Sequence, residues 1–451
     1  MVSSVRHERG VDNASGIFAW FRARPWLYAY VVLSLYAIVP GIRRVIDWKS
    51  GFSSVSIVSI LPLVSLLPAA AILFGWSRGT KIGRVPLVAG WLWLGAFAYA
   101  YAVGLATGNG PSATFTFLNF VLPMCFGVYV STLNITMEAL YERIASYALA
   151  LSVPIALYAI YQYAVPPPWD LYWIQQTNLV SVGIATPFGF KPFGTLNGPG
   201  SYADFIIGVV ILNLPRFRFG NFLRTGAIAL NIVTLALTLV RTDWISLILA
   251  LLAFVALSPR KAQNLSAIAV VSIILVVFSA NAAALFGNSQ VGIDLQNRFG
   301  SLTTLETDRS YRDRQEYFGD ALSTAASQPT GEGLGVVGVA AKLGAFGATL
   351  NFDNGYIARF TEMGYFGTAV YLATIGFVFV CTFRRWRSLS RSGDRAGAAI
   401  AAAIVAMQVS LLFGDVSSDH HNQLSGVLFW LSFAILFAHR VGGEADPHPA
   451  R

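Results

Sequence analysis

The feature that most constrains this chain is a succession of apolar stretches, each of roughly 17–25 residues, separated by short polar segments. A helix of that length crosses the hydrocarbon core of a bilayer, and lipid tolerates only segments that satisfy their own backbone polar groups. The stretches are too long to be the short alternating strands of a membrane barrel. The sequence therefore predicts an all-α polytopic membrane protein.

The pattern contains about twelve apolar spans. They cover residues 26–42, 53–76, 85–105, 112–132, 144–165, 200–215, 222–240, 243–258, 263–282, 355–383, 396–414 and 422–439. Composition agrees with this class, because 55% of the residues are hydrophobic and only 12% are charged. A soluble domain with this composition would lack the surface charge that keeps a protein in water.

Basic loops predict the orientation of these spans. With twelve spans, the loops that contain Arg216, Arg260 and Arg384 fall on the same side as the basic N-terminal tail, and the positive-inside rule assigns that side to the cytoplasm. The net charge of +9 is therefore attributed to membrane orientation rather than to nucleic-acid binding. Arg43 and Arg44 fit less well, because this topology places them outside.

The expected topology divides the chain into five segments. These are a cytoplasmic tail (1–25), nine helices (26–282) with an exterior loop at 166–199, a large periplasmic loop with short helices (283–350), three helices (351–440) and a second cytoplasmic tail (441–451). A large, charged, glycine-punctuated loop between two late helices usually carries chemistry or recognition.

The segment KPFGTLNGPG at 191–200 leads directly into an expected helix. Lys191 beside the exposed amides of a helix N-terminus would form a site for an anion such as phosphate. The alternative is a simple turn, with Lys191 reaching the membrane interface. In the same loop, Trp169, Tyr172 and Trp173 are either an interfacial aromatic belt or stacking surfaces for sugar rings.

Arg241 interrupts an apolar run between residues 222 and 258. A guanidinium close to bilayer depth costs several kcal/mol unless it is paired or hydrated. Asp243 is one possible partner. The other interpretation is a fixed cation at the rim of an external cavity, gripping a lipid-linked phosphate, which arginine binds in a bidentate manner.

The charged part of the large loop predicts a helix from Asp308 to Ser327, ended by Pro329 and Gly331. Its opposite charges at i,i+4 spacing are typical of a solvated, salt-bridged face. Its arginines would also form a clamp for a diphosphate. They are Arg309, Arg312 and Arg314.

Asp353 and Asn354 lie at the start of the tenth span. A carboxylate there can act as a general base, with a pKa set by partial burial and by neighbouring cations. Asp353 can equally be the N-cap of the helix, and the local pattern favours the cap.

The last candidate is GDVSSDHHNQ at 414–423, a polar turn between the final two spans. Adjacent histidines on a helix point apart, which is poor spacing for metal ligands, so no metal site is predicted. The chain also lacks a glycine-rich nucleotide-binding motif and a DxD-like motif on the cytoplasmic side. No cofactor is expected.

In this order, the motifs resemble those of the O-antigen ligase/polymerase superfamily, integral membrane glycosyltransferases of bacterial surface polysaccharide pathways. Lys191 to Gly198 looks like the family's basic residue before P-F-G, although arginine is commoner there. Arg241, with Thr242 and Trp244, looks like the family's arginine at the end of a mid-chain span. Arg309 to Gly335 looks like its arginine helix closed by a P-x-G-x-G-like turn.

One position departs from the ligase pattern. Ligases of the family carry a His-Asn pair before the tenth span, and that histidine is held to be catalytic. Asp353 and Asn354 stand there in this chain. The D-N-G-Y version looks more like the exopolysaccharide or O-antigen polymerases of the superfamily.

The resemblance implies a GT-C-like fold and metal-independent glycosyl transfer from undecaprenyl diphosphate at the periplasmic face of the bacterial inner membrane. Cations would stabilise the leaving diphosphate, and Asp353 would take the proton of an acceptor sugar hydroxyl. The implied catalytic residues are Asp353, Arg312 and Arg241, and the implied substrate-binding residues are Lys191, Asn197, Arg309, Arg314 and Asn354.

Polymerisation of lipid-linked repeat units onto an acceptor glycan, with a chain-length regulator as a candidate partner, is the function that this resemblance favours. The first alternative is a ligase that transfers the glycan to lipid A-core or another acceptor. The second is a flippase or transporter. It is disfavoured because the chain has no convincing internal repeat and its unusual charges lie at the outer rim rather than along a mid-membrane path.

Overall fold

The computed structural model describes residues 24–53, 56–76, 82–217, 221–259, 318–319, 322–323, 327–338 and 354–438. Within these ranges the regular secondary structure is helical, and only isolated bridge residues, such as the antiparallel pair Gly183 and Phe190, depart from it. The predicted all-α class is confirmed. The predictions for Arg309, Arg312, Arg314, Asp353 and the span at 263–282 lie outside the described residues.

Apart from α8, the helices coincide with the apolar stretches of the sequence. They are α2 (Pro25–Ser50), α3 (Ile57–Val64), α4 (Leu67–Ala71), α5 (Arg84–Ala106), α6 (Gly110–Ser131), α7 (Met137–Ala164), α8 (Pro168–Thr177), α9 (Pro199–Asn213), α10 (Phe222–Leu237), α11 (Arg241–Leu257), α16 (Gly355–Arg391), α17 (Arg395–Gly414) and α18 (Gln423–Phe437). In the described part of the chain, six helices are long and apolar enough to cross a membrane, or seven if the bent pair of α3 and α4 forms one span.

Judged by helix length and hydropathy, the described residues contain fewer than the twelve predicted spans. The apolar helices α9, α10, α11 and α18 have only 15, 16, 17 and 15 residues. A helix needs about 20 residues to cross the hydrocarbon core, so these four are shorter than a typical span. A multi-pass membrane protein is supported, and the total of twelve remains a prediction.

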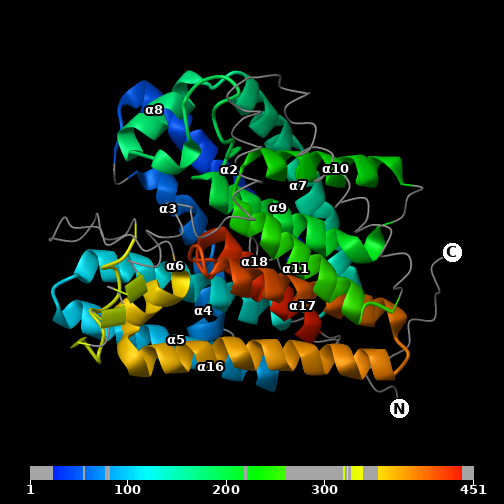
Figure 1. Ribbon diagram of the computed structural model, residues 1–451. Coiled ribbons are helices and arrows are strands. Elements are labelled where there is room, and N and C mark those ends of the chain that lie inside the picture. Colours follow the sequence, from blue (N-terminus) through cyan, green and yellow to red (C-terminus); the bar gives the residue numbers. More distant parts are fainter. Residues whose placement is uncertain are drawn as a thin grey trace, which may run out of the picture.

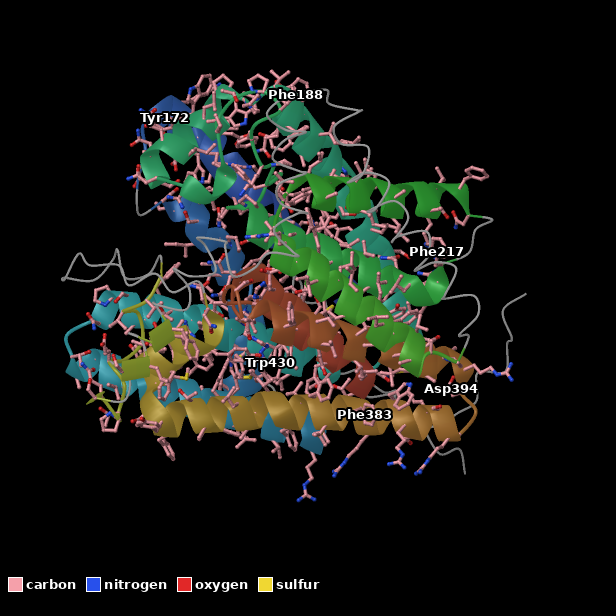
Figure 2. The ribbon with its side chains drawn as sticks, viewed as in Figure 1. Tyr172, Phe188, Phe217, Phe383, Asp394 and Trp430 are labelled. Carbon is pink, nitrogen blue, oxygen red and sulfur yellow. The ribbon has the colours of Figure 1, made fainter. Side chains whose placement is uncertain are left out.

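Helices α17 and α18 occupy the centre of the molecule, with α16 along one side and α9 and α11 along the other (Figure 1). Trp430 of α18 is fully buried between the helices (Figure 2). Close approach depends on small residues, as is usual for membrane helices. At Gly127 of α6, for example, an added Cβ would lie only 2.6 Å from the Cβ of Trp430.

Helix α16 is interrupted at Gly364, where the backbone has φ +60°. The turn at residues 329–335, predicted from its proline and glycines, packs into this break. Its backbone replaces helical hydrogen bonds, since Tyr365 N–H donates to the Pro329 carbonyl (3.1 Å) and Gly333 N–H donates to the Glu362 carbonyl (3.0 Å). The final part of the large loop is therefore fixed to the beginning of α16.

We expect Gly364→Ala to lower the free energy of unfolding by about 1–3 kcal/mol from its positive φ alone. The true loss should be larger, because the new Cβ would lie 2.3 Å from the carbonyl oxygen of Pro329. Gly376→Ala is the matched control, since a Cβ at that position of the same helix meets nothing within 4 Å. Thermal unfolding in detergent compares the two. Equal stability of both variants would contradict the structural role of the break.

The loop between α7 and α9 is held by a buried ion pair. Arg44 and Asp170 are both fully buried, and Arg44 Nε lies 3.1 Å from Asp170 Oδ1. The Arg44 guanidinium also donates to the carbonyls of Gly194 (2.5 Å) and Leu196 (3.1 Å). The position of Arg44, anomalous as an orientation signal, is thus explained by this packing role.

The aromatic residues of α8 also pack against the protein. Trp173 is buried and lies under the guanidinium of Arg43, 4.8 Å from its ring centroid. The Tyr172 hydroxyl accepts a hydrogen bond from Phe52 N–H (3.0 Å), and the Trp169 indole donates to Tyr158 (2.6 Å). These contacts account for Trp173 without either a membrane belt or a sugar platform.

Candidate functional site

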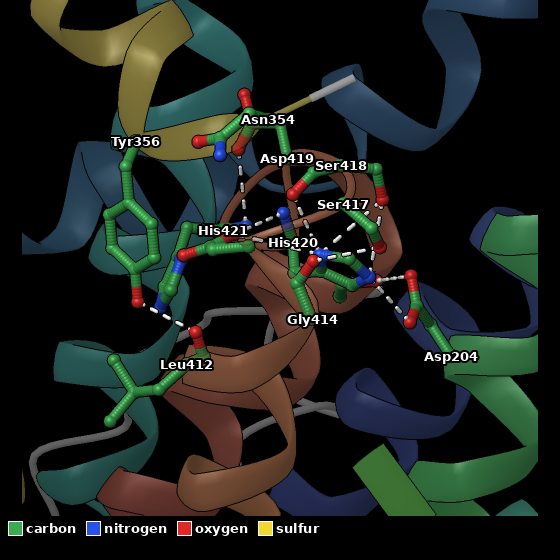
Figure 3. A network of polar contacts seen from close by, with 12 residues as sticks. Asp204, Asn354, Tyr356, Leu412, Gly414, Ser417, Ser418, Asp419, His420 and His421 are labelled. Atoms are coloured by element: carbon green, nitrogen blue, oxygen red, sulfur yellow. Dashed lines mark hydrogen bonds and ion pairs between the residues drawn. The ribbon is translucent and has the colours of Figure 1, made fainter. Parts of the chain in front are cut away.

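The turn between α17 and α18, residues 415–422, is the point at which three other helices meet (Figure 3). Helix α16 starts there, since Gly355 N–H donates to the Asp415 carbonyl (2.7 Å). From α9, Asp204 Oδ1 lies 2.9 Å from His420 Nε2. From α11, a carboxylate oxygen of Asp243 lies within 4.8 Å of both Asp204 and His420. The turn therefore brings together segments that are far apart in sequence.

Asp415 organises both histidines of this turn. Its Oδ1 accepts a hydrogen bond from the backbone N–H of His420 (2.8 Å), and its Oδ2 lies 2.6 Å from the imidazole Nδ1 of His421. The two imidazoles point to opposite sides of the turn (Figure 3), His420 toward Asp204 and His421 toward the hydroxyl of Tyr371 (3.3 Å). The histidines do point apart, but each has a defined role in a buried polar network.

The pKa values of Asp415 and His420 shift in opposite directions. Burial opposes ionisation of Asp415, but the charges and hydrogen bonds of His421 and His420 outweigh it and hold the pKa of Asp415 below its ordinary value. Burial also opposes protonation of His420. The neighbouring Asp204 and Asp415 outweigh that effect and raise the pKa of His420 well above its ordinary value.

A second buried ion pair connects this turn to the large loop. Arg359 Nη1 lies 2.5 Å from Glu362 Oε2, and Arg359 Nη2 lies 3.0 Å from Asp419 Oδ2. Glu362 Oε1 in turn accepts a hydrogen bond from Gly335 N–H (2.9 Å). The chain from Gly335 through Glu362 and Arg359 to Asp419 therefore couples the end of the loop to the turn.

Sequence reasoning missed this connection. Arg359 and Glu362 are ionisable residues inside an otherwise apolar span, which is costly and usually functional. That signal was present in the sequence. What the spacing alone does not show is that both side chains face Asp419 and Gly335, because these partners lie on other segments.

The N-cap of α16 is Asn354, whose side-chain oxygen accepts from Ile357 N–H (3.0 Å). The interpretation of Asp353 as the N-cap was therefore wrong. The side-chain oxygen of Asn354 is occupied by the cap, which limits its predicted substrate-binding role to the amide NH₂ group. Asp353 itself lies outside the described residues, next in sequence to a residue at the turn.

The remaining predicted site residues occupy two places. Arg241 is the first residue of α11, half-buried, and shares its first turn with Asp243. Lys191 is half-buried in the loop before α9, where its N–H donates to the Val182 carbonyl (2.8 Å), and Asn197 is exposed two residues before α9 begins. Arg241 and Asn354 lie close in sequence to residues that contact the α17–α18 turn, namely Asp243 and Gly355.

Comparison with known families decides what kind of protein carries this site. Residues 226–372 match the family model described as O-antigen ligase, Wzy_C. The match covers about a third of the chain and supports a relationship to the O-antigen ligase/polymerase superfamily. The matched segment contains Arg241, the turn at 329–335 and the broken start of α16. No curated protein matches the chain.

The apolar helices of the described residues support a multi-pass membrane protein, and the family that the segment matches is one of glycosyltransferase-like enzymes. The match ends within α16 and does not extend to the α17–α18 turn. The turn nevertheless lies against the matched segment, because Asp243 and Gly355, both within the match, approach it.

Proposed function

We propose that this protein polymerises undecaprenyl-diphosphate-linked oligosaccharide repeat units into exopolysaccharide or O-antigen at the periplasmic face of the inner membrane. The observation that carries the proposal is the convergence of the Arg241 end of α11 and the Asn354 end of α16 on one acidic, histidine-containing turn. A phosphate-binding cation and a proton acceptor are the two groups that this transfer requires.

In the proposed reaction, a hydroxyl oxygen of the acceptor glycan attacks the anomeric carbon of the lipid-linked donor. The bond from that carbon to the diphosphate oxygen breaks, and undecaprenyl diphosphate leaves. Arg241 and Arg312 stabilise the charge that develops on the leaving group, and Lys191, Asn197, Arg309, Arg314 and Asn354 bind the substrates. Asp353 takes the hydroxyl proton, so the anomeric configuration is inverted.

Arg241 is favourably placed for this role. The N-terminus of a helix carries partial positive charge and unsatisfied N–H groups, so an anion bound beside the first residue of α11 would gain from both. A phosphate there would also lie next to the turn at which α16 begins.

Two observations bear on the choice between polymerase and ligase. The matching family is described as O-antigen ligase, which favours transfer of a finished glycan to lipid A-core or another acceptor. The Asp353–Asn354 pair replaces the His-Asn pair of the ligases and favours polymerisation. The products distinguish them, because a polymerase lengthens the lipid-linked glycan whereas a ligase removes it from the lipid.

The test compares lipid-linked and secreted glycans from cells that carry the wild-type gene, a deletion, Asp353→Ala or Asp394→Asn. We expect deletion and Asp353→Ala to remove long polymer and to accumulate single lipid-linked repeats on the periplasmic side. Asp394→Asn is the control, since asparagine also serves as the N-cap of α17.

Other outcomes of this comparison have distinct meanings. Long lipid-linked polymer that fails to reach its acceptor would establish a ligase. Repeat units retained on the cytoplasmic side would indicate a flippase. Normal polymer in the Asp353→Ala strain would assign the base to another residue.

A further inference from the structure

Three ionisable side chains from three different elements meet in the interior beside the α17–α18 turn. They are Asp204 of α9, Asp243 of α11 and His420 of the turn. One carboxylate oxygen of each aspartate and one imidazole nitrogen all lie within 4.8 Å of one another. Asp243 is 2% exposed and His420 is 1% exposed, so water cannot solvate this cluster freely.

The Asp243 carboxylate has an unsatisfied oxygen. Asp204 has two partners, with His420 Nε2 2.9 Å from its Oδ1 and the Ser425 hydroxyl 3.3 Å from its Oδ2. In the described part of the chain, Asp243 Oδ2 is buried and accepts no hydrogen bond. A buried acceptor without a donor costs about 1–3 kcal/mol, and a carboxylate costs more. A second carboxylate nearby increases that cost by repulsion.

We infer that Asp204, Asp243 and His420 bind one divalent transition-metal ion. A cation would neutralise both carboxylates and would occupy the position that Asp243 Oδ2 faces. Carboxylates combined with an imidazole suit Mn²⁺ or Zn²⁺, whereas Mg²⁺ and Ca²⁺ prefer oxygen ligands alone. The adjacent histidines alone do not indicate this site in the sequence. Only His420 is a ligand, and the other two ligands, Asp204 and Asp243, come from other helices.

This site goes beyond the proposed glycosyl transfer, in which arginines supply the positive charge. Its consequence is structural: the ion joins the second turn of α9 and the first turn of α11 to the α17–α18 turn. Because Asp243 lies two residues after Arg241, the ion also fixes the start of α11, where Arg241 is placed. Metal binding and glycan synthesis are measured separately, so failure of one proposal leaves the other testable.

The test uses the full-length protein, purified in detergent, stripped with a chelator and then dialysed against Mn²⁺ or Zn²⁺. Elemental analysis should find about one metal ion per chain, and the metal should raise the unfolding temperature. Asp243→Asn keeps the shape of the side chain and removes its charge. We expect this variant to bind the metal at least about tenfold more weakly, by analogy with the loss seen when groups around metal sites are removed.

Asp394→Asn makes the same chemical change at the N-cap of α17, at the end of that helix remote from the turn (Figure 2), and should bind metal like the wild type. Asp204→Asn provides a second variant if Asp243→Asn does not fold, because the Asp204 side chain is 10% exposed and can be hydrated. Equal metal content in the wild type and the Asp243→Asn protein would overturn the inference. The inference would also be overturned if the wild type bound no metal and the Asp243→Asn variant unfolded at a higher temperature. Asp243 would then carry a proton in place of a metal ion.

Discussion

Arg44→Met should lower the free energy of unfolding by about 3–5 kcal/mol, the usual cost of removing one partner of a buried ion pair. Methionine retains most of the apolar stem but leaves Asp170 charged and fully buried. It also removes the donors to the Gly194 and Leu196 carbonyls. Unfolding followed in mixed detergent micelles measures the difference.

A double-mutant cycle identifies the source of this loss. Asp170→Leu alone should also be destabilising, because it leaves the Arg44 charge buried. The combined Arg44→Met and Asp170→Leu protein should be more stable than the sum of the single losses predicts, since neither charge remains. Arg143→Met, at an exposed site of α7, is the control and should change stability by less than about 1 kcal/mol. Additive single effects would mean that the pair does not act as a unit.

The positions of the helices could be predicted from the sequence because apolar length is a local property. Each described helix from α2 to α18 coincides with a polar-bounded apolar stretch, apart from the short α8 in the loop between α7 and α9. The number of spans could not be read as securely. Helices such as α9 and α18 are only 15 residues long, which is short of the roughly 20 residues that cross the hydrocarbon core.

The sequence predicted only part of the candidate site. A residue could be recognised when its own sequence neighbours made it unusual, but not when its role depends on a partner far away in the sequence. Arg241 stood out because a cation in an apolar run is costly. Arg44 misled the orientation analysis because its partner, Asp170, lies 126 positions later in the numbering. Charge counting along the chain cannot distinguish a loop cation from a buried ion pair.

The α17–α18 turn shows the same limit. Its histidines gave a weak signal on spacing alone, whereas Asp204, Asp243 and Tyr371 converge on them only in the folded protein. The N-cap of α16 was assigned one residue too early, to Asp353 instead of Asn354, because both residue types cap helices well. Helix ends are commonly uncertain by this amount.

Arg241→Gln should reduce the rate of glycan transfer by about 10²–10³-fold, the loss typical of removing one group that stabilises charge in a transition state. Glutamine keeps a hydrogen-bond donor and a similar length but has no charge. Arg241→Lys keeps the charge and loses the planar, bidentate geometry, so its rate should lie between those of the wild type and Arg241→Gln. The assay measures elongation of lipid-linked oligosaccharide by purified protein at saturating acceptor.

Arg395→Gln is the matched control for this series, because Arg395 is also the first residue of a helix but is exposed at the end of α17 remote from the turn. Its transfer rate should equal that of the wild type. Arg241→Gln should keep the wild-type unfolding temperature within a few degrees, since a half-buried residue at a helix start contributes little to the core. A slow but stable variant would therefore locate the loss in the reaction. An Arg241→Gln protein that elongates glycan at the wild-type rate would remove Arg241 from the mechanism, and the diphosphate would then have to be held by other cations, such as Lys191 or the arginines of the large loop.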